Sequence, residues 1–346
     1  MNNKAILLVN LGSPDTTNVP DVKRYLGEFL MDKYVIDVPF LIRFLLVKGI
    51  ILNFRPKKSA EAYASIWWDE GSPLIVLSKR LQKLVQKDSK LPVGLAMRYA
   101  NPSIKAGIEE LLEKQPQCKE IFVFPLYPHY AMATTLTVLE KTREVVKKYF
   151  PQLKIKYIES YYDHPSYIDA LANSIKKGLA GKKKKHLLFS FHGVPERHVR
   201  KTDPTKKHCM KVNNCCYSDC KEAHRYCYSH QVHRTARLVV EKLKLKEEDF
   251  TIAFQSRLGN DPWLSPATDA TIERLAKEGI KDLAVACPAF VSDCLETLEE
   301  IGEEGEEIFH EHGGKNYTLI PCLNEDPAWV NTIHELIADK KLHLTL

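Results

Sequence analysis

Three short apolar segments, each closed by a turn that contains Gly or Pro, occur twice in this chain in the same order. The first copy comprises residues 4–14, 93–102 and 120–128, and the second comprises residues 185–195, 251–262 and 282–290. Helical patterns lie between these segments, for example at 104–114, 136–150, 231–243 and 269–278. Because strands that alternate with helices assemble into parallel sheets, the repeat predicts an α/β fold. We expect two similar Rossmann-like domains, each a parallel sheet flanked by helices.

The boundary between the two domains is expected near residue 158. The first domain then covers residues 1–158 with an insertion at 15–72, and the second covers residues 159–346 with a cysteine-rich insertion at 205–227. Neither half contains a GxGxxG motif or a P-loop, so the sequence gives no support for nucleotide binding.

Charge and hydropathy restrict the partners and the compartment. The net charge of +6 favours an anionic ligand or an anionic membrane surface, and no basic tract interleaved with aromatic residues suggests nucleic acid. The N-terminus enters a strand pattern without a signal peptide, and charged residues interrupt the apolar stretch 35–54. We therefore expect a cytoplasmic protein, and we leave open peripheral contact with the inner face of the membrane. The oligomeric state is not defined by the sequence.

His192 follows an apolar run, Leu187 to Phe191, that is typical of a strand buried on both faces. Gly193 permits a sharp turn after it, and Pro195 ends the strand. Ligands of open α/β sheets bind beyond the carboxyl ends of the strands. A histidine at that position predicts a proton acceptor or a metal ligand.

A strongly acidic helical pattern covers residues 291–311. Its acids recur at three- and four-residue steps and should share one helix face: Asp293, Glu296, Glu300, Glu304, Glu307 and Glu311. We interpret residues 303–311 as a solvated face. The first three acids lie just after the end of a strand, and His192 also lies at a strand end. A row of carboxylates that leads to an imidazole is suited to bind a divalent cation while the cation loses its water.

Five of the nine cysteines fall within residues 209–227. In a reducing compartment such a group indicates an iron–sulfur cluster or a structural zinc. Cys215 and Cys216 are adjacent, which strains a single tetrahedral metal site and favours a two-iron cluster. The other cysteines are interpreted as small apolar core residues: Cys118, Cys287, Cys294 and Cys322.

The insertion at 15–72 is rich in large apolar residues. Most of them are expected to pack on the domain core, and some to form an apolar lip suited to a flat hydrophobic ligand. Arg55, Lys57 and Ser72 lie just beyond and could hold carboxylates.

Taken together, these motifs resemble the ferrochelatase family, lyases that insert ferrous iron into protoporphyrin IX to make haem. The resemblance covers nearly the whole chain and is carried by residues 10–14, 71–73, 98–99, 125–128, 190–195, 254–257, 262–264 and 290–297. It implies a chelatase-like fold in both halves, with protoporphyrin IX and ferrous iron as substrates.

The resemblance also implies site residues. His192 and Glu296 match the active-site pair, and Glu300 matches an acid further along the same helix. The resemblance implies that His192, Glu296 and Glu300 contact the substrate iron. Leu30 and Met31 match the porphyrin lip, and the remaining matches to pocket positions are Leu11, Arg55, Tyr63, Ser72, Arg98, Tyr127 and Trp263. Cys294 departs from the family, because many members have His there.

Some microbial members of the family carry a cysteine-rich insertion that binds a [2Fe-2S] cluster. By that resemblance the cluster ligands here are Cys209, Cys215, Cys216 and Cys220, with Cys227 as the substitute if one of them is not a ligand.

Four alternatives stay open at this point. Within the enzyme class they are a coproporphyrin III ferrochelatase and a cobalt chelatase, and the long apolar insertion favours protoporphyrin over the more polar substrate. The others are a porphyrin or haem carrier without catalysis, and an iron–sulfur redox or sensor protein.

Overall fold

The computed structural model describes residues 3–181, 185–257, 259 and 261–346, and the chain divides into two compact units. Unit 1 comprises Met1–Tyr127, Met132–Glu159 and Ile333–Leu346, and unit 2 comprises Pro128–Ala131 and Ser160–Thr332. Residues 258 and 260, which belong to the predicted segment 251–262, lie outside the described residues. The sequence prediction places the C-terminal segment Ile333–Leu346 in the second domain, whereas in the structure it belongs to unit 1.

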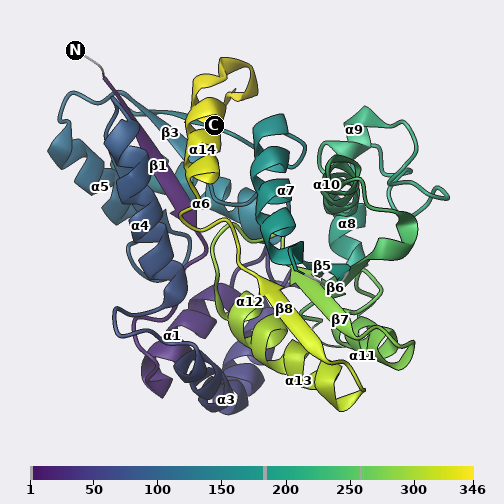
Figure 1. Cartoon of the computed structure of the whole chain (residues 1–346). Coiled ribbons are helices and arrows are strands. Elements are labelled where there is room, and N and C mark those ends of the chain that lie inside the picture. The colour runs from purple at the N-terminus through teal and green to yellow at the C-terminus, as the bar shows by residue number, and fades with distance from the viewer. Residues whose placement is uncertain (1–2, 182–184, 258, 260) are drawn as a thin grey trace. The chain divides into compact units, whose positions relative to one another are not determined.

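Unit 1 is built on a five-stranded sheet in the order β2-β1-β3-β4-β9 (Figure 1). Its strands are β1 (Lys4–Asn10), β2 (Val93–Met97), β3 (Glu120–Pro125), β4 (Lys154–Tyr157) and β9 (Leu344–Thr345). Its helices are α1 (Val19–Leu30), α2 (Phe40–Phe44), η1 (Leu45–Ile51), α3 (Leu52–Ser65), α4 (Pro73–Asp88), α5 (Ile104–Lys114), η2 (Met132–Leu136), α6 (Thr137–Tyr149) and η5 (Lys340–Leu342).

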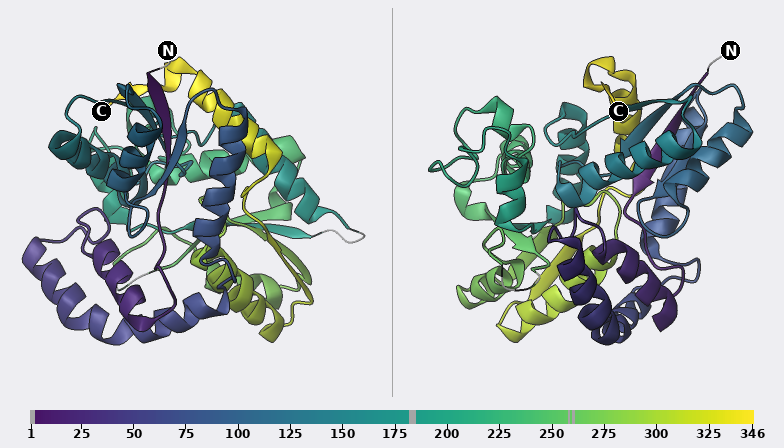
Figure 2. Two further views of the ribbon diagram at one scale, coloured as in Figure 1. Left: turned by 90° about the vertical axis from the view of Figure 1, so that its left-hand side faces the viewer. Right: turned by 180° about the vertical axis from the view of Figure 1, so that it is seen from behind.

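The first four strands of this sheet are parallel, and β9 is antiparallel to β4 through Lys156↔Thr345 and Tyr157↔Leu344. This pairing is the reason that the C-terminus belongs to unit 1. Residues of α5 and α6 bury one face of the sheet together with β1 and β3, and α4 lies on the opposite side (Figures 1 and 2).

The helices of the predicted insertion do not flank this sheet. Figure 2 shows α1, α2 and α3, drawn in purple to blue, beyond the carboxyl end of β1. α1 packs against α3, where Tyr25 meets Tyr63 edge to face at 6.2 Å between ring centroids. The insertion is therefore a helical layer of its own, placed where ligands of α/β sheets bind.

Unit 2 contains the parallel sheet β6-β5-β7-β8. Its strands are β5 (His186–His192), β6 (Phe250–Gln255), β7 (Asp282–Ala286) and β8 (Asn316–Ile320). Its helices are α7 (Pro165–Leu179), α8 (Glu196–Thr202), α9 (Lys221–His224), α10 (Tyr228–Leu243), η3 (Glu247–Asp249), α11 (Thr268–Lys277), α12 (Leu295–Thr297), η4 (Leu298–Glu304) and α13 (Gly305–Glu311). Helix α14 (Pro327–Ala338) begins in unit 2 and ends in unit 1.

The two sheets share one strand order. In each, the first strand of the unit lies between the second and the third: β2-β1-β3 in unit 1 and β6-β5-β7 in unit 2. Helices α11 and α13 bury one face of the second sheet, and α7 and α10 lie on the other (Figure 1). The predicted α/β class with two similar parallel-sheet halves is confirmed.

Candidate active site

Strand β5 brings His192 to the carboxyl end of the second sheet. Leu187 to Phe191 are fully buried between β6 and β7, and each large apolar side chain there contributes about 1.5–3 kcal/mol by its burial. His192 is half-buried and forms the last pair of the ladder, with Gln255. The chain then turns at Gly193, where a Cβ would lie 2.9 Å from the Gln255 carbonyl oxygen, so only glycine fits.

The imidazole of His192 has a defined tautomer. Its Nδ1 lies 2.6 Å from the carbonyl oxygen of Gly193, and because a carbonyl only accepts, Nδ1 must carry the hydrogen. In the neutral ring, Nε2 then bears the lone pair and can accept a proton. The ring packs against Phe290 at 6.2 Å between centroids, and the backbone carbonyl of His192 accepts a hydrogen bond from the Tyr228 hydroxyl at 2.8 Å.

Glu300 reaches the end of the neighbouring strand, β6. Its carboxylate accepts the backbone N–H of Ser256 at 2.7 Å and also the Ser256 hydroxyl. Burial raises the pKa of Glu300, and the negative charge of Glu296 raises it further. The hydrogen bonds from Ser256 and the positive charge of a protonated His192 lower this pKa, but the net shift is upward. The predicted residues His192 and Glu296 are therefore both close enough to Glu300 to influence its pKa.

Gln255 connects the strands of this site to the acidic helix. Its side-chain Nε2 donates to the backbone carbonyl of Glu296 at 2.7 Å, and its Oε1 accepts from the Ser190 hydroxyl at 2.9 Å. Gln255 is 3% exposed, so these bonds are shielded from water and fix the position of Glu296 relative to β5 and β6.

The acidic segment is not one regular helix. A π-helical stretch, η4, separates the single turn α12 from α13, and its i→i+5 hydrogen bonds change the spacing of the acids that we predicted for a uniform helix. π-Helical turns occur frequently at functional sites. The acids that we interpreted as solvated are exposed: Glu303, Glu304, Glu306, Glu307 and Glu311.

Asp293 has a different role from the other acids of the predicted row. It is 6% exposed, and its carboxylate accepts from Asn324 Nδ2 at 2.6 Å, from the Thr297 hydroxyl at 3.1 Å and from the Cys322 N–H at 3.2 Å. These three donors occupy both oxygens, so Asp293 anchors the start of the acidic segment to the loop after β8. Cys294, next to it, is buried, and burial raises the pKa of its thiol.

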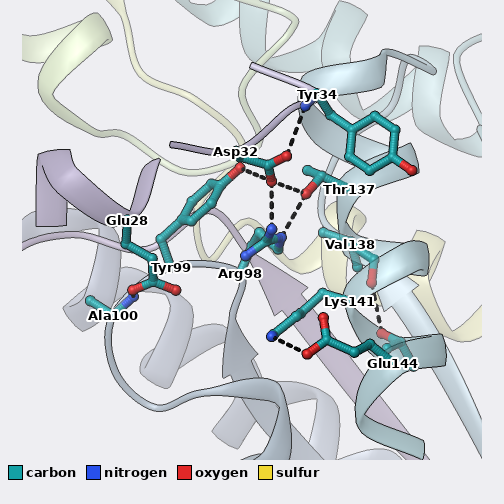
Figure 3. Close-up of polar contacts among 11 residues, drawn as sticks. Glu28, Asp32, Tyr34, Arg98, Tyr99, Ala100, Thr137, Val138, Lys141 and Glu144 are labelled. Atoms are coloured by element: carbon teal, nitrogen blue, oxygen red, sulfur yellow. Dashed lines mark hydrogen bonds and ion pairs between the residues drawn. The ribbon is translucent and has the colours of Figure 1, made fainter. Parts of the chain in front are cut away.

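In unit 1, Arg98 belongs to a buried polar network centred on Asp32 (Figure 3). Arg98 Nη2 lies 2.5 Å from Asp32 Oδ2, and the same oxygen accepts from the Tyr99 hydroxyl at 2.8 Å and from the Thr137 hydroxyl. The other oxygen accepts the Tyr34 N–H at 2.8 Å. The side chains of Asp32 and Arg98 are 4% and 11% exposed, so the ion pair is well shielded.

Asp32 directly follows Met31, one of the predicted lip residues. Arg98 comes after β2 and Thr137 begins α6, so the network ties the end of the lip segment to the sheet of unit 1. The predicted pocket residue Arg98 is thus paired with a carboxylate of the chain itself.

The other predicted pocket residues differ in exposure. Arg55 is exposed, and Leu11, Met31 and Trp263 are half-buried. The buried residues are Leu30, Tyr63, Ser72 and Tyr127. Trp263 pairs with Pro195 in a β-bridge of unit 2, and its indole nitrogen is buried without a hydrogen-bond partner within the described residues.

Helices α2, η1 and α3 carry an unusual surface of exposed large apolar side chains, here named the apolar rim: Phe40, Leu41, Ile42, Phe44, Leu45, Ile50 and Phe54. Phe54 is 79% exposed and Leu41 is 66% exposed. Buried Arg43 supports this surface from beneath by donating to the carbonyls of Ile36 and Val38. Across the part of the chain that is described, no helix is long and apolar enough to span a membrane.

The cysteine-rich insertion brings four thiols into contact, here named the thiol cluster: Cys209, Cys215, Cys216 and Cys227. Cys227 contacts Cys209 and Cys216, and Cys216 contacts Cys215. Cys220 stands at the N-cap position of the short helix α9 without a capping hydrogen bond from its side chain, and none of the described contacts among these four thiols involves it. No three His, Cys, Asp or Glu side chains among the described residues have the arrangement of a metal site.

Polar groups order the backbone around the thiol cluster. The carbonyl of Cys215 accepts from His208 Nε2 at 3.0 Å and from His224 Nε2 at 2.8 Å, and the carbonyl of Cys216 accepts from His230 Nδ1 at 2.6 Å. At the start of the insertion, Asp203 accepts three backbone N–H groups; although burial raises its pKa, these bonds and the Thr205 hydroxyl lower it to about 2.

Three residues that shape these sites escaped sequence reasoning: Asp32, Gln255 and Ser256. Gln255 and Ser256 lie within the Phe-Gln-Ser-Arg motif, and their position at the carboxyl end of a predicted strand was the available signal. Asp32 is one acid within a long insertion, and its partners lie 66, 67 and 105 residues away, so no local pattern marks it.

Comparison with solved structures defines the class of the fold. SirB from Bacillus subtilis, solved with Fe³⁺, matches this chain with a TM-score of 0.55 and 15% identity over 98% of each chain. The sirohydrochlorin chelatase SirB from Bacillus subtilis subspecies spizizenii, in complex with cobalt, matches with a TM-score of 0.51 and 13% identity over 98% of this chain and 95% of its own. At these identities the likeness concerns the fold, which is that of the chelatases.

Sequence comparison identifies the family within this class. The ferrochelatase family model matches residues 3–341. The ferrochelatases of Pseudomonas fluorescens (strain Pf0-1) and Azotobacter vinelandii are both 48% identical to this chain, over 337 and 341 residues, and the matches cover 97% of this chain and 98% of each relative. The chain belongs to the ferrochelatase family and is a lyase that inserts iron into a porphyrin for haem synthesis.

Proposed function

We propose that this protein inserts ferrous iron into protoporphyrin IX to form protohaem, with His192 as the base. The observation that carries the proposal is the 2.6 Å hydrogen bond from His192 Nδ1 to the Gly193 carbonyl, because it leaves Nε2 as the nitrogen that bears the lone pair when the ring is neutral. Insertion converts Fe²⁺ and the free porphyrin into the iron porphyrin and two protons. As the iron–nitrogen bonds form, one pyrrole proton passes to Nε2 of His192.

The second proton and the iron are assigned to the acids beside His192. Glu296 is positioned by Gln255 and accepts the remaining proton, and Glu300 holds the ion while it loses water. The raised pKa of Glu300 supports this role, since a carboxylate that is poorly stabilised by water gains more from a bound cation. The exposed acids of α13 supply a negative surface that attracts Fe²⁺ from solution.

The choice of protoporphyrin over coproporphyrin rests on the apolar rim. Protoporphyrin IX has two propionates and coproporphyrin III has four, so a large apolar surface favours the former. We propose that the rim contacts the apolar edge of the macrocycle and that Arg55, Tyr63 and Ser72 bind its propionates. Arg98 acts indirectly, by holding Asp32 and hence the segment that follows Met31.

Comparison of two porphyrin substrates tests this proposal. Initial rates of ferrous iron insertion are measured without oxygen for protoporphyrin IX and coproporphyrin III. We expect kcat/KM for protoporphyrin IX to be at least about tenfold higher, which corresponds to about 1.4 kcal/mol in the barrier. The reverse preference would identify a coproporphyrin enzyme, and tight binding of both without turnover would identify a carrier.

We also propose a [2Fe-2S] centre in the cysteine-rich insertion. Two features of the insertion support the proposal: the four thiols of the thiol cluster contact one another, and two of their sulfur atoms accept backbone N–H groups, from Met210 to Cys215 and from His230 to Cys227, each at 3.4 Å. These contacts favour Cys227 over Cys220 as the fourth ligand. When bound, the centre would supply order to a loop that has few apolar residues.

A peripheral position at the cytoplasmic face of the membrane is the last part of the proposal. The apolar rim offers insertion into the interface, and exposed Lys48, Arg55, Lys57 and Lys58 lie on the same helices. With a net charge of +6, the chain would be attracted to anionic lipids.

A further inference from the structure

The π-helical segment η4 ends where its hydrogen bonds change to the i→i+4 step of α13. At this end the N–H of Gly305 bonds to the carbonyl of Glu300, five residues back. In α13, which begins at Gly305, each N–H reaches back four residues instead. The next N–H along the chain then pairs with Gly302, so the helix passes over the carbonyl of Ile301.

Tyr317 supplies the hydrogen bond that the helix does not give to Ile301. The hydroxyl of Tyr317 donates to the Ile301 carbonyl at 2.6 Å. Ile301 is 2% exposed, so water has little access to this carbonyl, and a buried carbonyl without a partner is costly. The Tyr317 hydroxyl therefore compensates for the one acceptor that the π-helical register leaves over.

The ring of Tyr317 is held in place by the core of unit 2. Tyr317 belongs to β8, where it pairs with Leu283 of β7. Its ring packs against Phe309 of α13 at 5.9 Å between centroids, and Phe309 is fully buried between α13 and the sheet. The hydroxyl thus has a position that is defined by the sheet, and the acidic segment must adapt to it.

Gly305 leaves the room that the hydroxyl needs. A Cβ at position 305 would lie 2.6 Å from the Tyr317 hydroxyl, which is closer than side-chain atoms approach one another. Glycine is less favourable than alanine within a helix, so its presence at the start of α13 calls for a reason. A methyl group there would push the hydroxyl away from the carbonyl of Ile301.

The register of η4 determines where Glu300 lies. Glu300 belongs to the π-helical stretch, and its carboxylate accepts the N–H and the hydroxyl of Ser256 at the end of β6. Phe309 fixes α13 on the core, so a change of register displaces the residues that precede α13. Because an α-helix turns by about 100° per residue, a shift of one residue would turn the Glu300 side chain away from Ser256.

We propose that Tyr317 is a positioning residue that, together with Gly305, locks η4 in the π-helical register and so holds Glu300 at the end of β6. This inference rests on the iron-binding role proposed for Glu300. Without the hydroxyl, the carbonyl of Ile301 pairs with the N–H of Gly305, the segment takes the i→i+4 step, and the carboxylate leaves Ser256.

Crystal structures of the full-length wild type and of Tyr317→Phe test the lock without an activity assay. The substitution keeps the ring and removes only the hydroxyl. We expect the N–H of Gly305 to bond to Ile301 in place of Glu300 in the variant, and the Glu300 carboxylate to lie away from Ser256. An unchanged π-helical segment in Tyr317→Phe would overturn the proposal.

The division of the kinetic effect between KM and kcat is a second readout, which a merely structural role of Tyr317 would not produce. With Glu300 displaced, the apparent KM of Tyr317→Phe for Fe²⁺ should rise about three- to tenfold, while kcat and the KM for porphyrin stay within about twofold of the wild type. Tyr149→Phe is the control, because the Tyr149 side chain is exposed on α6, and it should match the wild type in all three constants.

Gly305→Ala reaches the same contact from the other side. It should raise the KM for Fe²⁺ on its own, and it should change that KM by less than about twofold when it is added to Tyr317→Phe, because the hydroxyl is then already absent. Additive effects of the two substitutions would contradict a shared contact. If circular dichroism shows that Tyr317→Phe does not fold, the crystal structure and the KM of Gly305→Ala decide the question.

The outcomes separate this inference from the proposed role of Glu300. A raised KM for Fe²⁺ in Glu300→Gln with a wild-type KM in Tyr317→Phe would overturn the lock and leave the role of Glu300 intact. A wild-type KM in Glu300→Gln would instead overturn the role of Glu300, and the hydrogen bonds of η4 in the crystal structure of Tyr317→Phe would still decide whether the hydroxyl sets the register.

Discussion

The carboxylate of Glu300 accepts the backbone N–H of Ser256 at 2.7 Å, so an acid of the π-helical segment is bonded to the residue that follows β6. Ser256 has a φ of +65°, in the left-handed region that non-glycine residues rarely adopt. Backbone strain of this kind is maintained only where the surroundings enforce it, and here Glu300 binds the strained peptide directly. The acid is thus held at the strand end at a cost in local stability.

The first prediction follows from the raised pKa of Glu300. Because its pKa in the folded protein lies above the ordinary value of 4.5, the neutral form is favoured by folding, and this contribution to stability is lost as the pH rises through the folded pKa. Glu300→Gln, which is neutral at every pH, should have a higher melting temperature than the wild type at pH 8. The difference should shrink as the pH is lowered towards 4.5 in calorimetric scans.

Glu300→Gln should also bind iron poorly, with an apparent KM for Fe²⁺ raised about tenfold or more. Glu296→Gln should instead lose turnover. Glu307→Gln, on the exposed face of α13, is the control for both measurements and should match the wild type in KM and in the pH dependence of melting. A Glu300→Gln protein that is less stable than the wild type at pH 8 would contradict the pKa argument.

The second prediction concerns the ion pair of Asp32 and Arg98. Removal of one partner leaves a buried charge uncompensated, so Asp32→Ala should lower the free energy of unfolding by about 3–5 kcal/mol in urea titrations. Glu140→Ala is the control, because it breaks an exposed pair with Arg143 on α6 and should cost about 0–1 kcal/mol. Equal effects of the two substitutions would show that the network does not stabilise unit 1.

The thiol contacts make a third prediction, about which cysteine completes the metal site. Cys227→Ser should abolish the iron and sulfide content of protein purified without oxygen, together with its visible absorption. Cys220→Ser should retain both, because Cys220 lies outside the thiol cluster. Retention of the centre in Cys227→Ser and its loss in Cys220→Ser would restore the ligand set that the sequence suggested.

A fourth prediction tests the apolar rim as a membrane-contacting surface. Replacement of Leu41 and Phe54 by Glu should reduce binding to vesicles rich in phosphatidylglycerol by about tenfold or more in flotation assays. The same charge placed at Tyr149, whose exposed side chain lies on α6, should leave binding unchanged. Similar binding of all three proteins to these vesicles would count against the rim.

Sequence patterns predicted the fold and part of the site for identifiable reasons. β5 was predicted because Leu187 to Phe191 form an uncharged run with four large apolar residues, which need burial on both faces, and that placed His192 at the end of the strand. The strand repeat was predicted in the same way, and the shared strand order of the two sheets agrees with it.

The remaining features depend on long-range contacts. The π-helical stretch differs from a regular helix only in its hydrogen-bond partners, and the acids around it have the same composition in either form. The spacing of the cysteines did not distinguish Cys220 from Cys227, because the contacts of Cys227 with Cys209 and Cys216 depend on the tertiary path of the insertion. The C-terminal pairing of β9 with β4 joins segments almost 190 residues apart, and a two-residue strand leaves no periodic signal.

The role of His192 as the base is tested most directly by single-turnover insertion of ferrous iron into protoporphyrin IX, followed by the visible spectrum without oxygen. For His192→Ala we predict a rate at least about 100-fold below that of the wild type, in keeping with the loss of a general base, while the spectrum of bound porphyrin shows that the substrate still binds. His310→Ala, on the exposed end of α13, should turn over at the wild-type rate. A near wild-type rate in His192→Ala would contradict the mechanism.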